Sequence, residues 1–385
     1  MPPFPEPPGV PARAPRWRAP LAVVVVALVL LGGAWWARPT TAPEPPPAAG
    51  PPASAPAAPQ ERPPSGTVSP DPVPSPSAEV AALAEEAFLS EEGRELFFRA
   101  EPEILAAAEF VGRCDGPTLR VRTGAVGCFT GSRIIVYAPA DARLRGFVVE
   151  TVAHETLHAA WEVLDRGVQQ ELTALLEAEL AQVPADRTIH EQLAASVGER
   201  PQSRPTELFA YVGTQVWRDG GLAAPLEEAY ARFVTDRAAL VAVHTGWRGM
   251  LDAMRADAEA AQNALLDRRT AHAQRRAQHA ADTAAVASYR QAYEAKAAEV
   301  AAMPPQEQER LQLSWTWWDG TDLPMAPAAD TLGAAARLLA RDDDALAGRS
   351  AELADEEAAL AAEQDRVDAL VADFRALTAQ LDPTT

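Results

Sequence analysis

The chain has 385 residues, with 54 acidic side chains against 34 lysines and arginines, which gives a formal net charge of −20 at pH 7. The phosphate backbone repels so acidic a protein, and we therefore expect no nucleic-acid partner. The length allows more than one folded domain, but residues 1–77 do not have the composition of one.

The N-terminal region predicts a membrane anchor. Residues 1–20 form a proline-rich basic tail, and residues 21–37 are an uninterrupted uncharged run with Trp35 and Trp36 near its end. The run is long enough to cross a bilayer as a helix, and the basic residues before it place the N-terminus on the cytoplasmic side. We predict a single-pass cell-membrane protein with an uncleaved signal anchor and an extracytoplasmic C-terminal part. A signal peptide cleaved near residues 32–34 is the alternative.

The next segment, residues 38–77, predicts a disordered linker. It consists largely of proline, alanine, serine and glutamate. Such a composition cannot bury enough apolar surface to fold, and proline keeps it extended. We interpret it as a spacer between the membrane and the folded part.

The two cysteines, Cys114 and Cys128, allow a disulfide. Oxidising conditions outside the cytoplasm would permit it to form. A pair of buried free thiols is the alternative, because two cysteines alone do not demonstrate a bridge.

Residues 78–246 predict a folded domain, mostly helical with a small antiparallel sheet. Its first part predicts two or three short helices over residues 78–112. Two strands follow, at 119–122 and 133–137, joined through a glycine-rich turn. The next helix begins at about 144–146 and ends near Gly167, which can adopt the left-handed conformation of a helix cap. Three further helices follow, with a loose segment at 184–205 between the first two: 169–182, 206–217 and 226–243.

The helix around residues 150–164 carries the motif His154-Glu155-Thr156-Leu157-His158. Residues four apart lie on the same face of a helix, so His154 and His158 can converge on one metal ion, and Glu155 can reach a water beside it. The rest of this helix is apolar, which predicts burial. Burying these side chains without partners would be costly, and a metal would supply the partner. A buried helix whose histidines are hydrogen-bonded is the alternative.

A catalytic zinc ion takes three protein ligands and keeps one position open. The two histidines supply two of them, and Glu207 is our choice for the third. It follows Pro205 at the start of a later predicted helix, among apolar neighbours where an unpaired carboxylate would be unfavourable. Glu162, His190 and Glu191 are the competing candidates.

This pattern resembles that of the zincin metallopeptidases, and specifically the gluzincins, in which the third ligand is a glutamate on a later helix. The matching residues are His154, Glu155, His158 and Glu207, the last within the run TELFAY. Thr206 precedes that glutamate, where the familiar gluzincin form has asparagine. The resemblance covers about residues 110–245.

The resemblance implies an α+β, mostly α, zincin-like core and hydrolysis of peptide bonds in a protein or peptide substrate. Zn²⁺ would polarise the carbonyl group and lower the pKa of its bound water, and Glu155 would act as general base. Tyr211 falls four residues after Glu207 and could steady the oxyanion; a half-buried core tyrosine is the alternative reading.

Residues 247–385 predict an alanine-rich helical hairpin. Mostly apolar residues recur every seven positions from 251 to 300, where His272 and His279 interrupt them, and again from 346 to 381. Sevenfold spacing of this kind is a coiled-coil signal. Two long helices folded back on each other fit better than a parallel dimer, which stays an alternative. Between them lie Trp315, Trp317 and Trp318, which we interpret as packing residues.

The helical hairpin also supports a second function hypothesis. The chain could be a non-enzymatic envelope protein in which the zincin-like core is a scaffold and the coiled-coil tail binds a partner or a second copy. Intact His154, Glu155 and His158 favour the enzyme, because a scaffold has no need for the glutamate.

Overall fold

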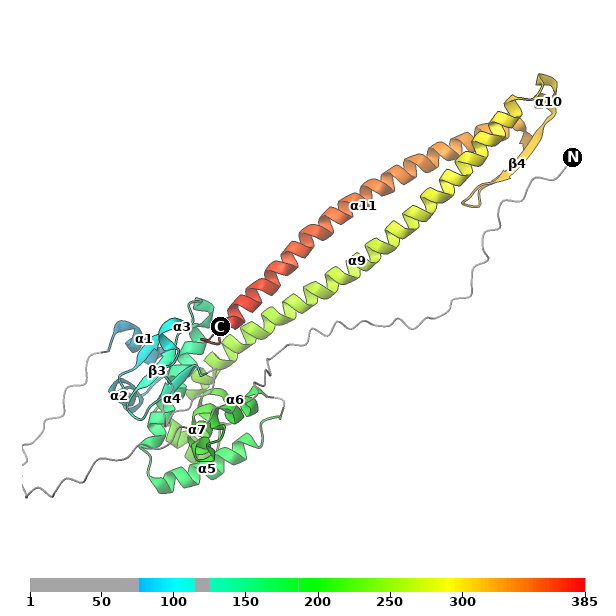
Figure 1. Cartoon of the computed structure of the whole chain (residues 1–385). Helices are drawn as coiled ribbons and strands as arrows, with labels where there is room; N and C mark the ends of the chain where they lie inside the picture. The colour runs from blue at the N-terminus through cyan, green and yellow to red at the C-terminus, as the bar shows by residue number, and fades with distance from the viewer. Residues whose placement is uncertain (1–75, 115–124, 186, 385) are drawn as a thin grey trace, which may run out of the picture. The chain divides into compact units, whose positions relative to one another are not determined.

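A computed structural model of the chain describes residues 76–114, 125–185 and 187–384 (Figure 1). The expected basic tail, the anchor at residues 21–37 and nearly all of the linker lie outside these residues. Among the described helices, none is both long and apolar enough to cross a bilayer. The described part is an α+β structure, mostly helical, with two small sheets.

Three short helices begin the described chain, as expected: α1 (Ala78–Glu86), α2 (Glu91–Arg99) and α3 (Ala107–Phe110). Serine side chains cap the first two, because Ser77 Oγ accepts a hydrogen bond from the Val80 N–H and Ser90 Oγ from the Gly93 N–H. Their apolar faces, including Leu83 and Phe97, are fully buried in the main core.

The first sheet has the order β1-β3-β2, with β1 (Glu103–Leu105), β2 (Gly127–Phe129) and β3 (Ile134–Tyr137). The sequence predicts a strand at β3, but its antiparallel partner β2 lies where the sequence predicts the glycine-rich turn. The expectation of an antiparallel sheet is wrong for β1, which pairs in parallel with β3. β1 has only three residues, too few to show an alternating pattern. The expected strand at 119–122 lies outside the described residues.

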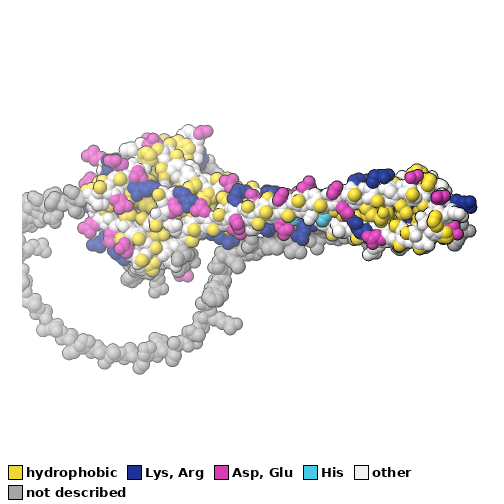
Figure 2. All heavy atoms as spheres, turned by 90° about the horizontal axis from the view of Figure 1, so that it is seen from above, with side chains coloured by type: hydrophobic (Ala, Val, Ile, Leu, Met, Phe, Trp, Pro, Cys, Tyr) yellow, Lys and Arg dark blue, Asp and Glu magenta, His cyan; other side chains and the backbone are white. Residues whose placement is uncertain are grey.

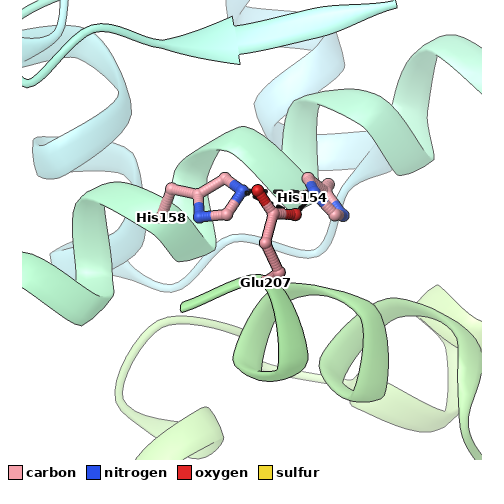
Figure 3. Close-up of side chains that lie close together, drawn as sticks. All are labelled: His154, His158 and Glu207. Carbon is pink, nitrogen blue, oxygen red and sulfur yellow. Dashed lines mark hydrogen bonds and ion pairs between the residues drawn. The ribbon is translucent and has the colours of Figure 1, made fainter. Parts of the chain in front are cut away.

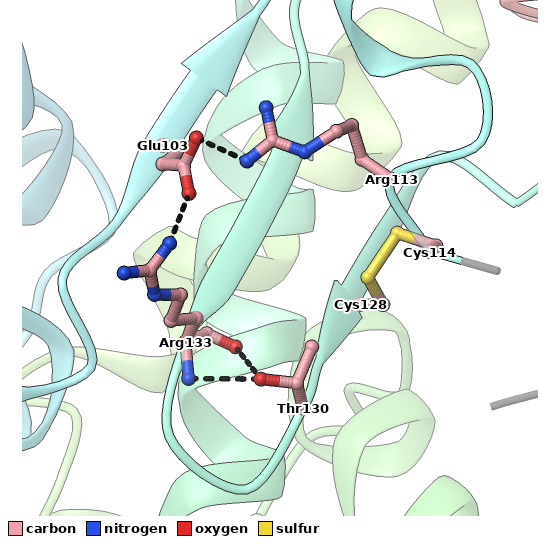
Figure 4. The surroundings of a disulfide bond; sticks show 6 residues. All are labelled: Glu103, Arg113, Cys114, Cys128, Thr130 and Arg133. Atoms are coloured by element: carbon pink, nitrogen blue, oxygen red, sulfur yellow. Dashed lines mark hydrogen bonds and ion pairs between the residues drawn. A yellow bond between two sulfur atoms is a disulfide. The ribbon is translucent and has the colours of Figure 1, made fainter. Parts of the chain in front are cut away.

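A disulfide joins Cys114, just after α3, to Cys128 in β2, with the two Cα atoms 5.9 Å apart (Figure 4). Glu103 of β1 lies nearby and accepts hydrogen bonds from Arg113 and Arg133. The disulfide and these hydrogen bonds hold the segment after α3 and the residue before β3 against β1 and β2.

Helix α4 (Arg145–Glu162) follows the short 3₁₀ turn Ala142–Leu144 and packs against the sheet and against α1, α2, α7 and α9. Burial on almost every side explains its continuous apolar sequence. The helix ends at Glu162 rather than near Gly167, which lies in the first turn of the next helix and does not adopt the expected left-handed conformation.

The following helices are α5 (Arg166–Leu180), α6 (Thr188–Val197), α7 (Arg204–Gln215) and α8 (Ala224–Ala231), with a 3₁₀ turn at Pro201–Ser203. The expected loose segment at 184–205 is therefore wrong over α6. Only Ile189 and Leu193 of α6 are buried, which is too sparse an apolar pattern to predict a helix. Pro205 lies in the first turn of α7, as expected.

The expected helix at 226–243 is two helices. α8 ends at Ala231, and α9 (Arg237–Ala301) begins after Asp236. Between them Val234 forms an isolated antiparallel bridge with Leu89, which takes the backbone out of helical geometry. Asp236 then caps α9 by accepting a hydrogen bond from the Ala239 N–H.

The two long helices α9 and α11 (Ala328–Ala379) pack along each other as an antiparallel hairpin (Figure 1). Their connection contains α10 (Pro305–Arg310) and a second, two-stranded sheet of β4 (Gln312–Thr316) and β5 (Asp322–Pro327). The sequence did not predict this sheet. α9 crosses position 246 without a break, so the expected boundary between domain and hairpin falls inside one helix.

The interface between α9 and α11 contains both apolar and polar residues. Apolar layers, such as Leu265 with Leu360 and Val367, alternate with polar pairs such as His272 with Glu356. Acidic and basic side chains intersperse along its surface (Figure 2). Trp317 is 1% exposed, which confirms a packing role for it.

Candidate metal centre

Two histidines of α4 face each other across one turn of the helix. Nε2 of His154 lies 3.2 Å from Nε2 of His158. Each side chain is 13% exposed, so the pair is largely shielded from solvent. The spacing of four residues places both imidazoles on one face, as the sequence predicts.

Glu207 approaches this pair from α7. Its Oε2 atom lies 3.7 Å from Nε2 of both His154 and His158, and its carboxylate points between the two imidazoles (Figure 3). Arg204, one turn earlier, pairs with Glu177 of α5 and fixes the start of α7. The structure therefore brings together the three residues chosen from the sequence.

A glycine lets α7 come this close to α4. A Cβ atom at Gly213 would lie 2.6 Å from Leu157 Cδ1 and 2.7 Å from Tyr230 Cε1, both shorter than real Cβ contacts. A larger residue at this position would push α7 outward. Glu207 lies on the same helix, so it would move away from the histidines.

Thr206 makes the second contact between α7 and the histidine pair. Its Oγ1 lies 2.8 Å from Nδ1 of His158. When Nδ1–H donates to this hydroxyl, the lone pair of Nε2 is free and points toward Glu207. A second hydrogen bond of this kind fixes the tautomer of a metal-binding histidine.

The protonation states favour metal binding. Burial lowers the pKa of His158 to about 4, so it is neutral at pH 7. Burial raises the pKa of Glu207, but its interactions with His154 and His158, 3.7 Å away, and with Arg200 outweigh burial and leave the pKa lowered. For His154, burial lowers the pKa, but the nearby carboxylates of Glu207 and Glu155 outweigh burial and leave the pKa raised. The set thus contains one ionised carboxylate and at least one neutral imidazole.

The spacing of the three ligand atoms fits zinc. Ligand atoms placed tetrahedrally at about 2.05 Å from a zinc ion are about 3.3 Å apart. The corresponding separations here are 3.2 Å between the two nitrogens and 3.7 Å from each nitrogen to the carboxylate oxygen. Two imidazoles and a carboxylate are also a donor set that zinc accepts. In the described part of the chain, no other group of three such residues is gathered this closely.

Glu155 lies beside the three candidate ligands, on the side of the sheet. It is 5% exposed and lies against β2. A Cβ atom at Gly127 would lie 2.7 Å from Glu155 Oε1, so a glycine is needed where β2 passes this side chain. Burial raises the pKa of Glu155 to about 7.

Tyr211 also lies at the site. Its ring centroid is 4.5 Å from that of His154, and its hydroxyl is 2.8 Å from Oγ of Ser196 in α6. Burial raises the pKa of this phenol, so it is protonated at neutral pH. The ring is half-buried against the main core, so packing and a role in the chemistry are both compatible with its position.

The competing third ligands do not join the set. Glu162 is exposed, and Glu191 is exposed on α6. His190 is engaged elsewhere, because its Nε2 lies 3.2 Å from the carbonyl oxygen of Val183. Glu207 is the one candidate that lies within reach of both histidines.

Sequence reasoning missed a buried carboxylate next to this site. Glu150, one turn before His154, is 7% exposed and accepts hydrogen bonds from Gln215, His244 and Trp247. A glutamate four residues before the first histidine of the motif is a visible signal. Its partners on α7 and α9 are far away in sequence and could not be assigned. Ser196, the partner of Tyr211, was missed because α6 was not predicted.

No family model, no curated protein and no solved structure matches this chain. The case for function therefore depends on the geometry of this site.

Proposed function

We propose that this chain is a zinc-dependent peptidase, held at the cell membrane by residues 21–37, whose folded part acts outside the cytoplasm. The observation that carries the proposal is the convergence of His154, His158 and Glu207 between α4 and α7. Helix α4 supplies two of these ligand atoms and α7 the third, in a site shielded from solvent.

The three side chains would hold the metal, and Thr206 would keep the Nε2 lone pair of His158 directed at it. Zinc bound there would supply Lewis acidity, which lowers the pKa of a water and polarises a carbonyl group. These are the two demands of peptide-bond hydrolysis, because the amide is a poor electrophile and water a poor nucleophile.

Glu155 is the proposed general base. It is adjacent to His154 but outside the set of ligand atoms, and its side chain lies against Gly127 of β2. A carboxylate in this position can accept the proton of an attacking water and transfer it to the leaving amine.

Tyr211 is the proposed donor to the developing oxyanion. Its phenol keeps its proton because burial raises its pKa, and its ring packs on His154. The hydrogen bond with Ser196 would orient the hydroxyl from the side of α6. A protonated donor aimed at the developing negative charge lowers the barrier most effectively when it is preorganised.

Two features support the proposed compartment. The uncharged run at residues 21–37 has the length of a membrane helix. The disulfide between Cys114 and Cys128 is of a kind that persists under oxidising conditions and is rare in the cytosol.

Metal analysis together with an activity assay tests the proposal. The purified wild-type protein should contain about one zinc per chain, and the double variant His154→Ala, His158→Ala should contain none. The wild type should also cleave an unfolded protein substrate, and a chelator should stop the cleavage. Zinc binding without hydrolysis of any peptide library would favour the non-enzymatic alternative, in which the hairpin of α9 and α11 binds a partner. Absence of zinc from the wild type would remove the metal centre itself.

A further inference from the structure

Glu150 is a buried carboxylate beside the metal centre that has no role in the chemistry proposed above. It lies one turn before His154 on α4 and is 7% exposed. Burying an ionised carboxylate is costly unless hydrogen bonds satisfy it. Burial raises the pKa of Glu150, but the hydrogen bonds from His244, Trp247 and Gln215 outweigh burial and leave the pKa lowered. The fold therefore maintains a negative charge at this position at neutral pH.

The two oxygens of Glu150 bind two different helices. Oε1 accepts a hydrogen bond of 2.8 Å from Nε2 of Gln215, the last residue of α7. Oε2 accepts one of 2.8 Å from Nδ1 of His244 and one of 2.7 Å from Nε1 of Trp247, both on α9. Because an ionised carboxylate can only accept, Nδ1 of His244 carries the hydrogen. One side chain of α4 thus holds both α7 and α9.

Gln215 makes the second of two polar contacts between α7 and α4. The first joins Thr206, near the start of α7, to His158 of α4 at 2.8 Å. A helix rises about 1.5 Å per residue, so the two contacts lie roughly 12 to 14 Å apart along both helices. Two contacts with this separation fix both the sliding and the tilt of α7 on α4. The position of Glu207, which is next to Thr206, therefore depends on both.

The contacts to α9 are made at the root of the hairpin. A Cβ atom at Gly146, in the first turn of α4, would lie 3.3 Å from Trp247 Cβ and from Val243 Cγ1, so a glycine lets α9 approach closely here. The ring of Trp247 is packed edge-on against Phe147 of α4, with centroids 5.5 Å apart. Helix α9 continues from here into the hairpin without a break. The first helix of the hairpin is thus fixed to the helix that carries the histidines.

We propose that Glu150 is a positioning residue for the metal centre. Its Oε1 holds α7, and with it Glu207, in register with the two histidines of α4. Its Oε2 makes that register depend on the root of the hairpin. The proposal rests on the metal centre of the function proposed above. Ligand distances at a metal site are held to within about 0.2 Å, so a small movement of α7 should lower the affinity for zinc.

An exchange of the two partners tests the contact between Glu150 and Gln215. Gln215→Glu alone places two carboxylates against each other, and their repulsion should move α7 away from α4. Zinc affinity should fall roughly 10- to 100-fold, the scale for losing a group that supports a metal site. Adding Glu150→Gln should restore most of the affinity, because an amide at position 150 can donate to the new carboxylate and accept from His244 and Trp247. Competition with a chelating dye measures the affinity of each full-length protein.

Gln169→Glu is the matched control. Gln169 on α5 is half-buried, as Gln215 is, and its Nε2 also donates to α4, at 2.7 Å from the carbonyl oxygen of Trp161. The substitution therefore disturbs a comparable contact between two helices without touching the register of α7. Zinc affinity should stay at the wild-type value.

Two substitutions of His244 test the contribution of the hairpin root. His244→Leu removes one of the α9 donors, whereas His244→Asn keeps a nitrogen donor in the place of Nδ1. We expect zinc affinity to fall by up to about tenfold in His244→Leu, the scale of one lost charge-assisted hydrogen bond. His244→Asn should retain most of the affinity. The three candidate ligands lie on α4 and α7, so a loss in His244→Leu would be transmitted from α9.

Amide hydrogen exchange of the metal-free proteins distinguishes positioning from a general loss of stability. Gln215→Glu should raise the exchange rates over α7, and adding Glu150→Gln should reverse this rise. Helices α1 and α2 pack on α4 but not through Glu150, so their exchange rates should stay at the wild-type values.

The outcomes separate this proposal from the proposed function. Wild-type zinc affinity in Gln215→Glu, no recovery in the double variant, an equal loss in Gln169→Glu, or faster exchange throughout the folded part would overturn the positioning role. Equal affinities in the two His244 variants would overturn its dependence on the hairpin. If the wild type binds zinc but hydrolyses no peptide, the peptidase fails and the expected affinity changes still establish the positioning role. Absence of zinc from the wild type would remove both.

Discussion

The hydroxyl of Thr206 lies 2.8 Å from Nδ1 of His158, although the two residues are 48 positions apart in the chain. This contact joins α7 to α4 at the candidate metal centre, directly beside the proposed ligand Glu207. In the proposed zinc site it would give Thr206 a role of its own, because it would fix which ring nitrogen of His158 faces the metal.

Replacement of Thr206 should therefore weaken zinc binding without removing a ligand. We expect Thr206→Val, which keeps the shape but lacks the hydroxyl, to lower zinc affinity roughly 10- to 100-fold. Thr206→Ser, which keeps the hydroxyl, is the control and should retain most of the affinity. Competition with a chelating dye measures both. Equal affinities for the two variants would show that the hydroxyl does not act on His158.

Replacement of Glu207 by alanine should lower the zinc occupancy of the protein, whereas replacement of Glu162 by alanine should not. Glu207→Ala removes the oxygen that lies 3.7 Å from both histidine nitrogens, so zinc occupancy should fall well below about one per chain. Glu162→Ala is the matched control, because this exposed glutamate is on the same helix as the histidines but outside the set. Elemental analysis after dialysis measures the zinc content of both variants. Full zinc occupancy in Glu207→Ala would show that Glu207 is not a ligand.

Glu155→Gln should separate metal binding from catalysis. The change keeps the size of the side chain but removes the base, so zinc content should be unchanged while peptidase activity falls at least ~100-fold. Thermal stability should change by no more than about 1 kcal/mol, because glutamine has nearly the same size and shape as glutamate. Activity that persists in this variant would place the proton transfer elsewhere.

The disulfide between Cys114 and Cys128 should contribute measurably to stability. It closes a loop with a sequence separation of 14, and a loop of about 15 residues corresponds to about 3 kcal/mol. The Cys114→Ser, Cys128→Ser protein should lose roughly this amount in denaturant unfolding. Mass spectrometry of the alkylated, non-reduced wild type should find no free thiol, and labelling of both cysteines would contradict the bridge.

The stability of the end of the hairpin that connects α9 to α11 should depend on pH through Asp342. This side chain is 4% exposed and accepts hydrogen bonds of 2.7 Å from both Trp317 and Trp318. Burial raises its pKa, but these hydrogen bonds and Arg341 outweigh it and leave the pKa lowered. The ordinary value for aspartate is about 3.9. Its stabilising contribution is therefore complete above that value and is lost as the pH falls through the lower pKa of the folded state.

Tryptophan fluorescence during acid titration measures this effect. Asp342→Asn should loosen the packing of Trp317 already at neutral pH and flatten the acid transition. Asp344→Asn is the control, because Asp344 is exposed two residues further along the same helix. An identical acid transition in wild type and Asp342→Asn would assign the pH dependence to other groups.

The sequence alone predicts the features that depend on local periodicity. The spacing of His154 and His158 predicts two imidazoles on one face, and the apolar positions around them predict the buried helix. Repeats of seven predict the two long helices, and serine or proline at helix starts predicts the beginnings of α2 and α7. In each case the signal lies within a few turns of the chain, where backbone geometry fixes which side chains are neighbours.

Only the tertiary structure decides the contacts between distant segments. Sequence reasoning offered four candidates for the third ligand, and the packing of α7 on α4, which Gly213 permits, selects Glu207. The sequence did not predict the parallel pairing of β1 or the break between α8 and α9 at the Leu89–Val234 bridge. These features arise where residues far apart in sequence meet, and there packing and hydrogen bonding override local preference.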